Sequence, residues 1–133
     1  MGIMFSKKKI LVVEDNELNR MIITTILGEQ GCILTEAVNG KEAVDIFEAS
    51  PVGSFDLILM DVQMPVMDGY EATRCIRRSV HPDAKKIIIF AVTANAFQED
   101  LDKALEAGMN DAITKPLNIA KMIEKIGHIR MGE

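Results

Sequence analysis

The fold is decided by the stretch LILMDVQMPVMDG, residues Leu57–Gly69. It opens with a continuous apolar run, and such runs are typical of strands that are buried on both faces of a parallel sheet. Asp61 follows this run directly, and Pro65 and Gly69 then indicate a loop. The stretch therefore predicts a buried strand that carries a carboxylate at its end, followed by a loop that leads into a helix.

Short apolar runs and amphipathic stretches alternate along the rest of the chain. Strands are predicted at Ile10–Val13, Cys32–Val38, Phe55–Met60, Ile87–Val92 and Ala112–Thr114. Helices are predicted on apolar stripes made of Leu18, Met21, Ile22, Thr25 and Ile26; Ala43, Ile46 and Phe47; Ala72, Cys75 and Ile76; Phe97, Leu101, Ala104 and Leu105; and Ile119, Met122, Ile123, Ile126 and Ile129. This alternation predicts an α/β fold, with a parallel sheet covered by helices on both faces.

Polar residues and a glycine mark the expected ends of these helices. Asn16 is placed to cap the first helix, and Gly31 to end it. Asn39 and Glu42 have the spacing of a capping box. Asp68 is placed to cap the helix that follows Gly69.

Composition excludes several classes of protein. The 133 residues include 15 basic and 20 acidic side chains, and the resulting net charge of −5 argues against a nucleic-acid-binding surface. The basic run Lys7–Lys9 is too short to change this and is interpreted as a solubilising flank. No apolar run approaches the ~20 residues of a membrane span. Cys32 and Cys75 have no metal-binding or redox spacing and fit a reducing cytoplasm.

Polar residues stand at the carboxyl ends of four predicted strands. They are Glu14 and Asp15 after the first strand, Asp61 after the third, Thr93 after the fourth and Lys115 after the fifth. In an open parallel sheet, ligands bind beyond these ends, at the point where the strand order reverses. A sheet ordered 2-1-3-4-5 places the first and third strands side by side there. The three acids are then expected to converge, with Thr93 and Lys115 beside them.

Three converging carboxylates predict a site for a divalent cation. Like charges held a few ångströms apart cannot all stay ionised without a partner, and a hard cation resolves the conflict. Mg²⁺ prefers oxygen ligands and retains several waters, so two carboxylates and a carbonyl suffice. Lys115 adds a second positive charge, and the combination suits a phosphoryl group.

The chain resembles the receiver domains of two-component response regulators, which have a flavodoxin-like fold. The resemblance rests on VVEDN at Val12–Asn16, LILMDVQMPVMDG at Leu57–Gly69, AVTANA at Ala91–Ala96 and GMNDAITKPL at Gly108–Leu117. It implies a (βα)5 three-layer sandwich with a parallel sheet in the order 2-1-3-4-5. The wording of these motifs is most similar to the receivers of hybrid sensor histidine kinases.

The resemblance also implies a role for each polar residue at the expected site. Asp61 is the phosphorylation site and accepts a phosphoryl group from a phosphohistidine on a partner. Glu14, Asp15, Asp61 and the backbone carbonyl of Gln63 bind Mg²⁺, for which Mn²⁺ or Ca²⁺ can substitute. Lys115 pairs with a phosphoryl oxygen. The domain catalyses its own phosphorylation and dephosphorylation and turns over no external substrate.

Four positions are implied in tuning and readout. Gln63 and Asn95 flank the phosphoryl group and tune its hydrolysis. Thr93 is the switch residue whose hydroxyl moves toward the phosphoryl group. Many receivers carry an aromatic residue three positions before the lysine, whereas this chain has Ala112 there. Readout is therefore expected to depend on the loop after Thr93 and the helix that follows it.

Domain organisation and partners follow from the same resemblance. Residues 1–8 are expected to be a leader or linker and residues 9–131 the receiver domain, with no output domain. The expected partner is a histidine kinase or phosphotransfer domain. A homodimer would use the face made by the fourth helix, fifth strand and fifth helix. We expect a cytoplasmic location, alone or as the cytoplasmic part of a membrane-anchored sensor kinase, without nucleic-acid or membrane contact.

Three alternative functions remain open at this point. An atypical receiver would keep the fold and act only as a protein-interaction module. A metal-dependent phosphatase with an aspartyl nucleophile usually has a second acid two residues later, where this chain has Gln63. A flavin carrier is compatible with the fold alone, but Glu14 and Asp15 would repel the flavin phosphate.

Overall fold

Five parallel strands form a single sheet in the order β2-β1-β3-β4-β5. The structure is a computed structural model that describes residues 7–94, 97–114 and 119–127. The elements are β1 Lys9–Val13, α1 Glu17–Glu29, β2 Ile33–Ala37, α2 Gly40–Ala49, β3 Leu57–Asp61, α3 Gly69–Arg78, β4 Ile88–Thr93, α4 Gln98–Ala107, β5 Asp111–Thr114 and α5 Ile119–Gly127. The predicted strand order and the predicted alternation of strands and helices are both confirmed.

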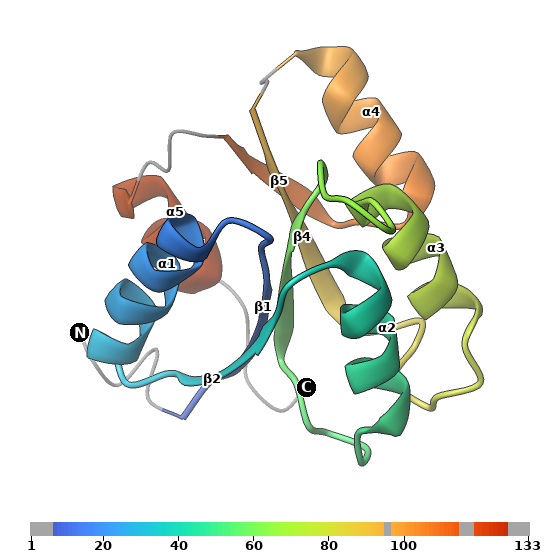
Figure 1. Cartoon of the computed structure of the whole chain (residues 1–133), viewed down its shortest axis with the longest axis horizontal. Helices are drawn as coiled ribbons and strands as arrows, with labels where there is room; N and C mark the ends of the chain where they lie inside the picture. The colour runs from blue at the N-terminus through green and yellow to red at the C-terminus, as the bar shows by residue number, and fades with distance from the viewer. Residues whose placement is uncertain (1–6, 95–96, 115–118, 128–133) are drawn as a thin grey trace.

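The sheet is the middle layer of three. Helices α1 and α5 cover one face, and α2, α3 and α4 cover the other (Figure 1). Successive side chains of a strand point to opposite faces, so β1 contributes to two cores. Leu11 and Val13 pack on the α2–α4 side, whereas Ile10 and Val12 pack on the α1–α5 side. The flavodoxin-like three-layer arrangement is thereby confirmed.

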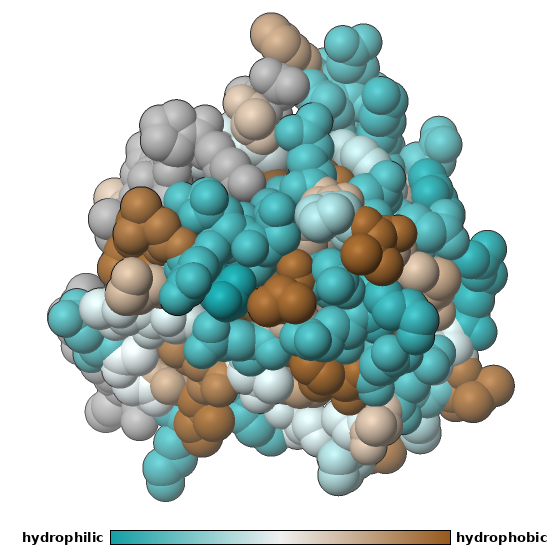
Figure 2. Space-filling model, viewed as in Figure 1, coloured by the Kyte–Doolittle hydropathy of each residue, from teal (hydrophilic) through white to brown (hydrophobic). Residues whose placement is uncertain are grey.

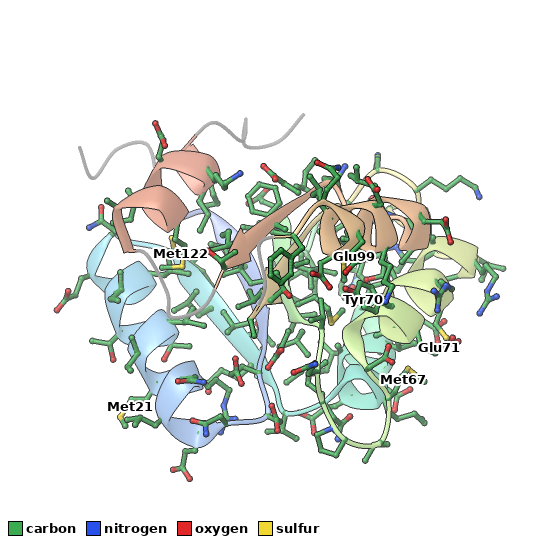
Figure 3. The ribbon with its side chains drawn as sticks, turned by 90° about the horizontal axis from the view of Figure 1, so that it is seen from above. Met21, Met67, Tyr70, Glu71, Glu99 and Met122 are labelled. Carbon is green, nitrogen blue, oxygen red and sulfur yellow. The ribbon has the colours of Figure 1, made fainter. Side chains whose placement is uncertain are left out.

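Helix α1 buries a different face from the one predicted. Leu18, Met21 and Ile22 are 40–61% exposed, while Ile23 and Leu27 are buried. Figure 3 shows Met21 on the outer side of α1. The helix carries apolar residues on more than one face, so helical spacing alone does not choose the inward one. The prediction of a helix was right, and of its predicted inward stripe Ile26 does pack against the core, whereas Leu18, Met21 and Ile22 do not.

Three further positions differ from expectation. Phe97 lies just before α4 as its N-cap residue, and it and Leu105 are exposed. Lys8 is almost fully buried and donates a hydrogen bond to the carbonyl of Ile126 at 3.0 Å. Burial lowers the pKa of this ammonium group, against the opposing effect of Asp56. Lys8 therefore belongs to the packed domain and is not part of a solubilising flank.

The predicted helix caps are present. Side-chain oxygens of Asn16, Asn39 and Asp68 accept hydrogen bonds from backbone N–H groups of α1, α2 and α3 respectively. Glu42 completes its box one residue earlier than expected, because its carboxylate accepts from the N–H of Val38 at 3.1 Å. Local sequence thus determines where these three helices begin.

The visible surface is mostly polar, with separate apolar groups between charged side chains (Figure 2). Within the described ranges, no helix has both the length and the apolar character needed to cross a bilayer.

Gly69 brings the start of α3 against the end of β3. Its N–H donates to the carbonyl of Val62 at 3.1 Å, and a Cβ at this position would lie 2.2 Å from the carbonyl oxygen of Asp61. Only glycine fits this close backbone approach. The two ends of the loop between Asp61 and Gly69 are consequently held close together at the end of β3.

Substituting two glycines by alanine should change stability in opposite directions. Gly69→Ala is expected to lower the free energy of unfolding by about 2–3 kcal/mol, because the backbone of Asp61 must move. Gly28→Ala should raise it by about 0.5–1 kcal/mol, since this Cβ would meet Leu34 at an ordinary 3.9 Å inside a helix. Urea denaturation measures both changes, and equal effects would contradict the packing described.

The only tyrosine of the chain, Tyr70, reports the contact between α3 and α4. Figure 3 shows it near Glu99 of α4. Burial raises the pKa of its phenol, and the nearby carboxylates of Asp100 and Asp68 raise it further. The folded protein therefore retains this proton at a pH where the unfolded chain has lost it.

This pKa shift predicts a loss of stability at alkaline pH. The contribution of Tyr70 is complete below the unfolded pKa of 10.0 and disappears as the pH rises through the higher folded value. Because the chain has one tyrosine and no tryptophan, ultraviolet titration follows this group alone. The midpoint should lie higher in the folded protein than in urea and should fall in an Asp100→Asn variant.

Candidate functional site

The site lies at the carboxyl edge of the sheet, where β1 and β3 run side by side. Val13 of β1 pairs with Met60 of β3, so the residues that follow them, Glu14 and Asp61, end neighbouring strands. Carboxylate oxygens of Glu14, Asp15 and Asp61 all lie within 4.8 Å of one another. The predicted convergence of the three acids is present, and no other such cluster occurs in the described part of the chain.

The three carboxylates differ in burial. Glu14 and Asp61 are each 1% exposed, whereas Asp15 is exposed. Backbone N–H groups hold the two buried acids in place: Asn16 donates to Glu14 Oε2 at 3.1 Å, and Gln63 donates to Asp61 Oδ1 at 3.1 Å. The cluster therefore consists of two buried carboxylates that are held by backbone N–H groups and one carboxylate that is exposed to solvent.

Thr93 lies at the same edge. It is the last residue of β4 and is 6% exposed. Asp61 pairs with Val92, so Thr93 stands one position beyond the residue opposite the central aspartate. The sheet register thus brings Thr93 toward the acid cluster from the neighbouring strand.

Of the remaining four predicted site residues, the structure describes Gln63 and Ala112. Gln63 lies in the exposed loop after Asp61. Ala112 is a partly buried residue of β5 that pairs with Ala91. Lys115 and Asn95 lie outside the described residues, so their expected positions beside the acids stay predictions.

The loop after Asp61 holds an unusual backbone conformation. Val66 has φ 72° and is 81% exposed, and the N–H of Met67 donates to the carbonyl of Pro65 at 2.8 Å. These values describe a tight three-residue turn with its central residue in the left-handed region, where a β-branched side chain is unfavourable. Met64 and Met67, on either side, are partly buried and pack against the core.

Arg20 is a part of this site that the sequence prediction missed. Its Nη1 donates to the backbone carbonyl of Glu14 at 2.8 Å, and its Nε donates to Glu36 Oε1 at 2.9 Å. The available signal was the position of an arginine one turn into α1, where the helix dipole disfavours a cation. A cation at such a position indicates a specific partner nearby.

The acid cluster fits a hard divalent cation. Carboxylate oxygens are the ligands that Mg²⁺ prefers, and ionised oxygens this close together repel one another without a cation. The cluster of Glu14, Asp15 and Asp61 supplies such oxygens from two adjacent strand ends. The residues present therefore match the metal predicted from the sequence.

This chain belongs to the response regulator receiver domain family, which its sequence matches over residues 10–127. The fold and the acidic cluster at its carboxyl edge agree with this assignment. The chain is thus a receiver domain of the kind used in phosphorelay signalling.

Its curated relatives include much longer hybrid kinases. The chain is 43% identical over 121 residues to hybrid signal transduction histidine kinase I of Dictyostelium discoideum, covering 90% of this chain and 7% of that protein. It is 36% identical over 135 residues to probable histidine kinase 2 of Oryza sativa subsp. indica, covering 93% of this chain and 13% of that protein. The chain therefore spans a small part of the relatives it matches.

Two solved receivers are similar in both sequence and structure. One is the receiver domain of the sensor histidine kinase PA1611 from Pseudomonas aeruginosa PAO1, solved with a magnesium ion coordinated in its active site cleft (TM-score 0.83, 38% identity, 96% of this chain and 100% of that chain). The other is from the co-crystal structure of the Saccharomyces cerevisiae phosphotransfer protein Ypd1 with the Ssk1 receiver domain (TM-score 0.82, 36% identity, 94% and 90%).

Replacing the carboxylate of Asp61 by an amide should stabilise the protein in the absence of Mg²⁺ and should reduce the stabilisation that added Mg²⁺ provides. In EDTA, Asp61→Asn is expected to raise the free energy of unfolding by about 1 kcal/mol, because it removes like-charge repulsion while its side-chain oxygen can still accept from Gln63. Added Mg²⁺ should stabilise the wild type, by about 2.7 kcal/mol at 100 times the dissociation constant. The variant should gain much less.

Thermal denaturation with and without Mg²⁺ measures both effects. Asp45→Asn is the matched control, because Asp45 is an exposed acid on α2 that pairs with Lys41. It should behave like the wild type toward Mg²⁺. If Mg²⁺ stabilises Asp61→Asn as much as the wild type, Asp61 is not a ligand of the metal.

Proposed function

We propose that this receiver takes a phosphoryl group from a phosphohistidine onto Asp61 in a reaction that requires Mg²⁺. The observation that carries the proposal is the cluster of Glu14, Asp15 and Asp61, whose carboxylate oxygens lie within 4.8 Å of one another. Asp61 is one of its two buried members and lies at the end of the middle strand β3. The magnesium ion in the similar PA1611 receiver supports the same ion here.

The transfer exchanges one bond to phosphorus for another. An Asp61 carboxylate oxygen forms a bond to phosphorus, and the bond from phosphorus to the donor's imidazole nitrogen breaks, with its electron pair returning to the imidazole. Reactions of this kind depend mainly on positioning and charge neutralisation. When bound, Mg²⁺ supplies positive charge to the phosphoryl oxygens. The chain's own part is to hold Asp61 rigidly, through its strand and the N–H of Gln63.

The other site residues complete the proposed machinery. Glu14 and Asp15 bind the metal together with Asp61 and the backbone carbonyl of Gln63, and Mn²⁺ or Ca²⁺ can replace Mg²⁺. Lys115 pairs with a phosphoryl oxygen, and the hydroxyl of Thr93 bonds another. The side chains of Gln63 and Asn95 set the rate of hydrolysis. In this proposal the domain catalyses only its own phosphorylation and dephosphorylation.

Readout is proposed to begin at Thr93 and to pass to α4. Ala112 is too small to act as the inward-turning aromatic switch found at this position in many receivers. Phosphorylation would then change the loop after Thr93 and the surface made by α4, β5 and α5. That surface is the proposed dimer face, and Leu105 on α4 is half-exposed.

The proposed donor is a histidine kinase or a histidine phosphotransfer domain in the cytoplasm. A complex between a similar receiver and the phosphotransfer protein Ypd1 supports this class of partner. The long hybrid kinases among the relatives support a location within, or beside, such a kinase. The partner would reach Asp61 from the open carboxyl edge of the sheet.

Incubation with acetyl phosphate and Mg²⁺ tests the proposal without any partner. The intact mass should increase by one phosphoryl group in the wild type and in Asp45→Asn, and should not increase in Asp61→Asn or in EDTA. Here the phosphorus–oxygen bond of acetyl phosphate breaks and acetate leaves. Labelling of Asp61→Asn at the wild-type rate would overturn the assignment of Asp61. Absence of both labelling and Mg²⁺ stabilisation in the wild type would favour the protein-interaction module instead.

A further inference from the structure

Arg20 makes two contacts near the acid cluster: a hydrogen bond to the backbone carbonyl of Glu14 and an ion pair with Glu36. Its side chain is 15% exposed, whereas that of Glu36, its ionic partner on β2, is 54% exposed. An ion pair with one member in water contributes little to stability. The 2.8 Å hydrogen bond from Nη1 to the carbonyl of Glu14 is the more sheltered of the two contacts.

This hydrogen bond fixes the peptide that joins two proposed metal ligands. The carbonyl of Glu14 lies in the same rigid plane as the Cα of Asp15. The N–H of Glu14 donates to the carbonyl of Ala37 at 3.1 Å. Both polar groups of the Glu14 backbone are therefore held, which restricts rotation of the peptide that leads into Asp15.

Arg20 and Asn16 close a ring around Glu14. The N–H of Arg20 donates to the carbonyl of Asn16 at 2.9 Å, and the N–H of Asn16 donates to Glu14 Oε2 at 3.1 Å. Two residues at the start of α1 thus hold Glu14: Arg20 donates to its backbone carbonyl, and Asn16 donates to its carboxylate. Glu36 orients the guanidinium from β2, on the far side of β1 from Asp61.

We infer that Arg20 is a positioning residue for the divalent-cation site. It holds the Glu14–Asp15 peptide so that both carboxylates face Asp61, and Glu36 balances its charge so that the arginine does not compete with the metal. This inference rests on the proposed function, because it requires the acid cluster to bind Mg²⁺. Replacing groups that orient metal ligands typically weakens metal binding by about 10–100-fold.

Positioning and simple electrostatics predict opposite results for Arg20→Gln. Removing a positive charge near the cluster would tighten Mg²⁺ binding if charge alone mattered. If Arg20 positions the ligands, the same change weakens binding. A role limited to overall stability would leave the affinity of the folded protein unchanged.

Isothermal titration calorimetry with MgCl₂ tests the inference on the full chain. Arg20→Gln should weaken Mg²⁺ binding about tenfold. Arg20→Lys keeps the charge but cannot make both contacts, so it should lie between Arg20→Gln and the wild type. Arg74→Gln is the matched control, because it removes the same charge from an exposed pair with Glu71 on α3, and it should bind like the wild type.

Each outcome decides between the two proposals. Wild-type affinity, or tighter binding, in both Arg20 variants would overturn the positioning role while the proposed function stands. A wild type that binds no Mg²⁺ at millimolar concentration would overturn the proposed function and this inference with it. Thermal melting in EDTA shows which variants are folded, and Arg20→Lys alone decides the question if Arg20→Gln is unfolded at the assay temperature.

Discussion

Mutual repulsion between three carboxylates is the constraint on which this structure depends. Glu14, Asp15 and Asp61 lie within 4.8 Å of one another at the ends of β1 and β3. A rigid surrounding backbone opposes relaxation of such a cluster. Strands β1 and β3 are buried on both faces over almost their full length, and their packed cores supply this rigidity. The apolar sheet is therefore the support that makes a cation site of this kind stable.

Backbone contacts reinforce that support around the rim. Gly69 lets α3 start against the backbone of Asp61, and Arg20 secures the carbonyl of Glu14 from the opposite side. Exposed Val66 sits in a tight turn in the loop between Asp61 and Gly69. The edge thus combines tightly held acids with a loop whose own conformation is unfavourable.

The helix caps could be predicted because they depend on local residues. The strand order came from the resemblance to receiver domains, and the convergence of the acids follows from that order. Asp61 follows an unmistakable buried strand, and Asn16 caps its helix through its own side chain. The inward face of α1 could not be predicted, since Met21 and Ile23 are both apolar and it is packing on the sheet that buries one and not the other. The burial of Lys8 also depends on a distant partner, the last turn of α5.

The hydrogen bond between Lys8 and Ile126 joins the beginning of β1 to the end of α5 at 3.0 Å. All strands run in one direction, so this junction lies at the amino edge of the sheet, opposite the acids. This contact therefore fixes the first strand and the last helix of the described domain to each other on the side of the sheet away from the acid cluster.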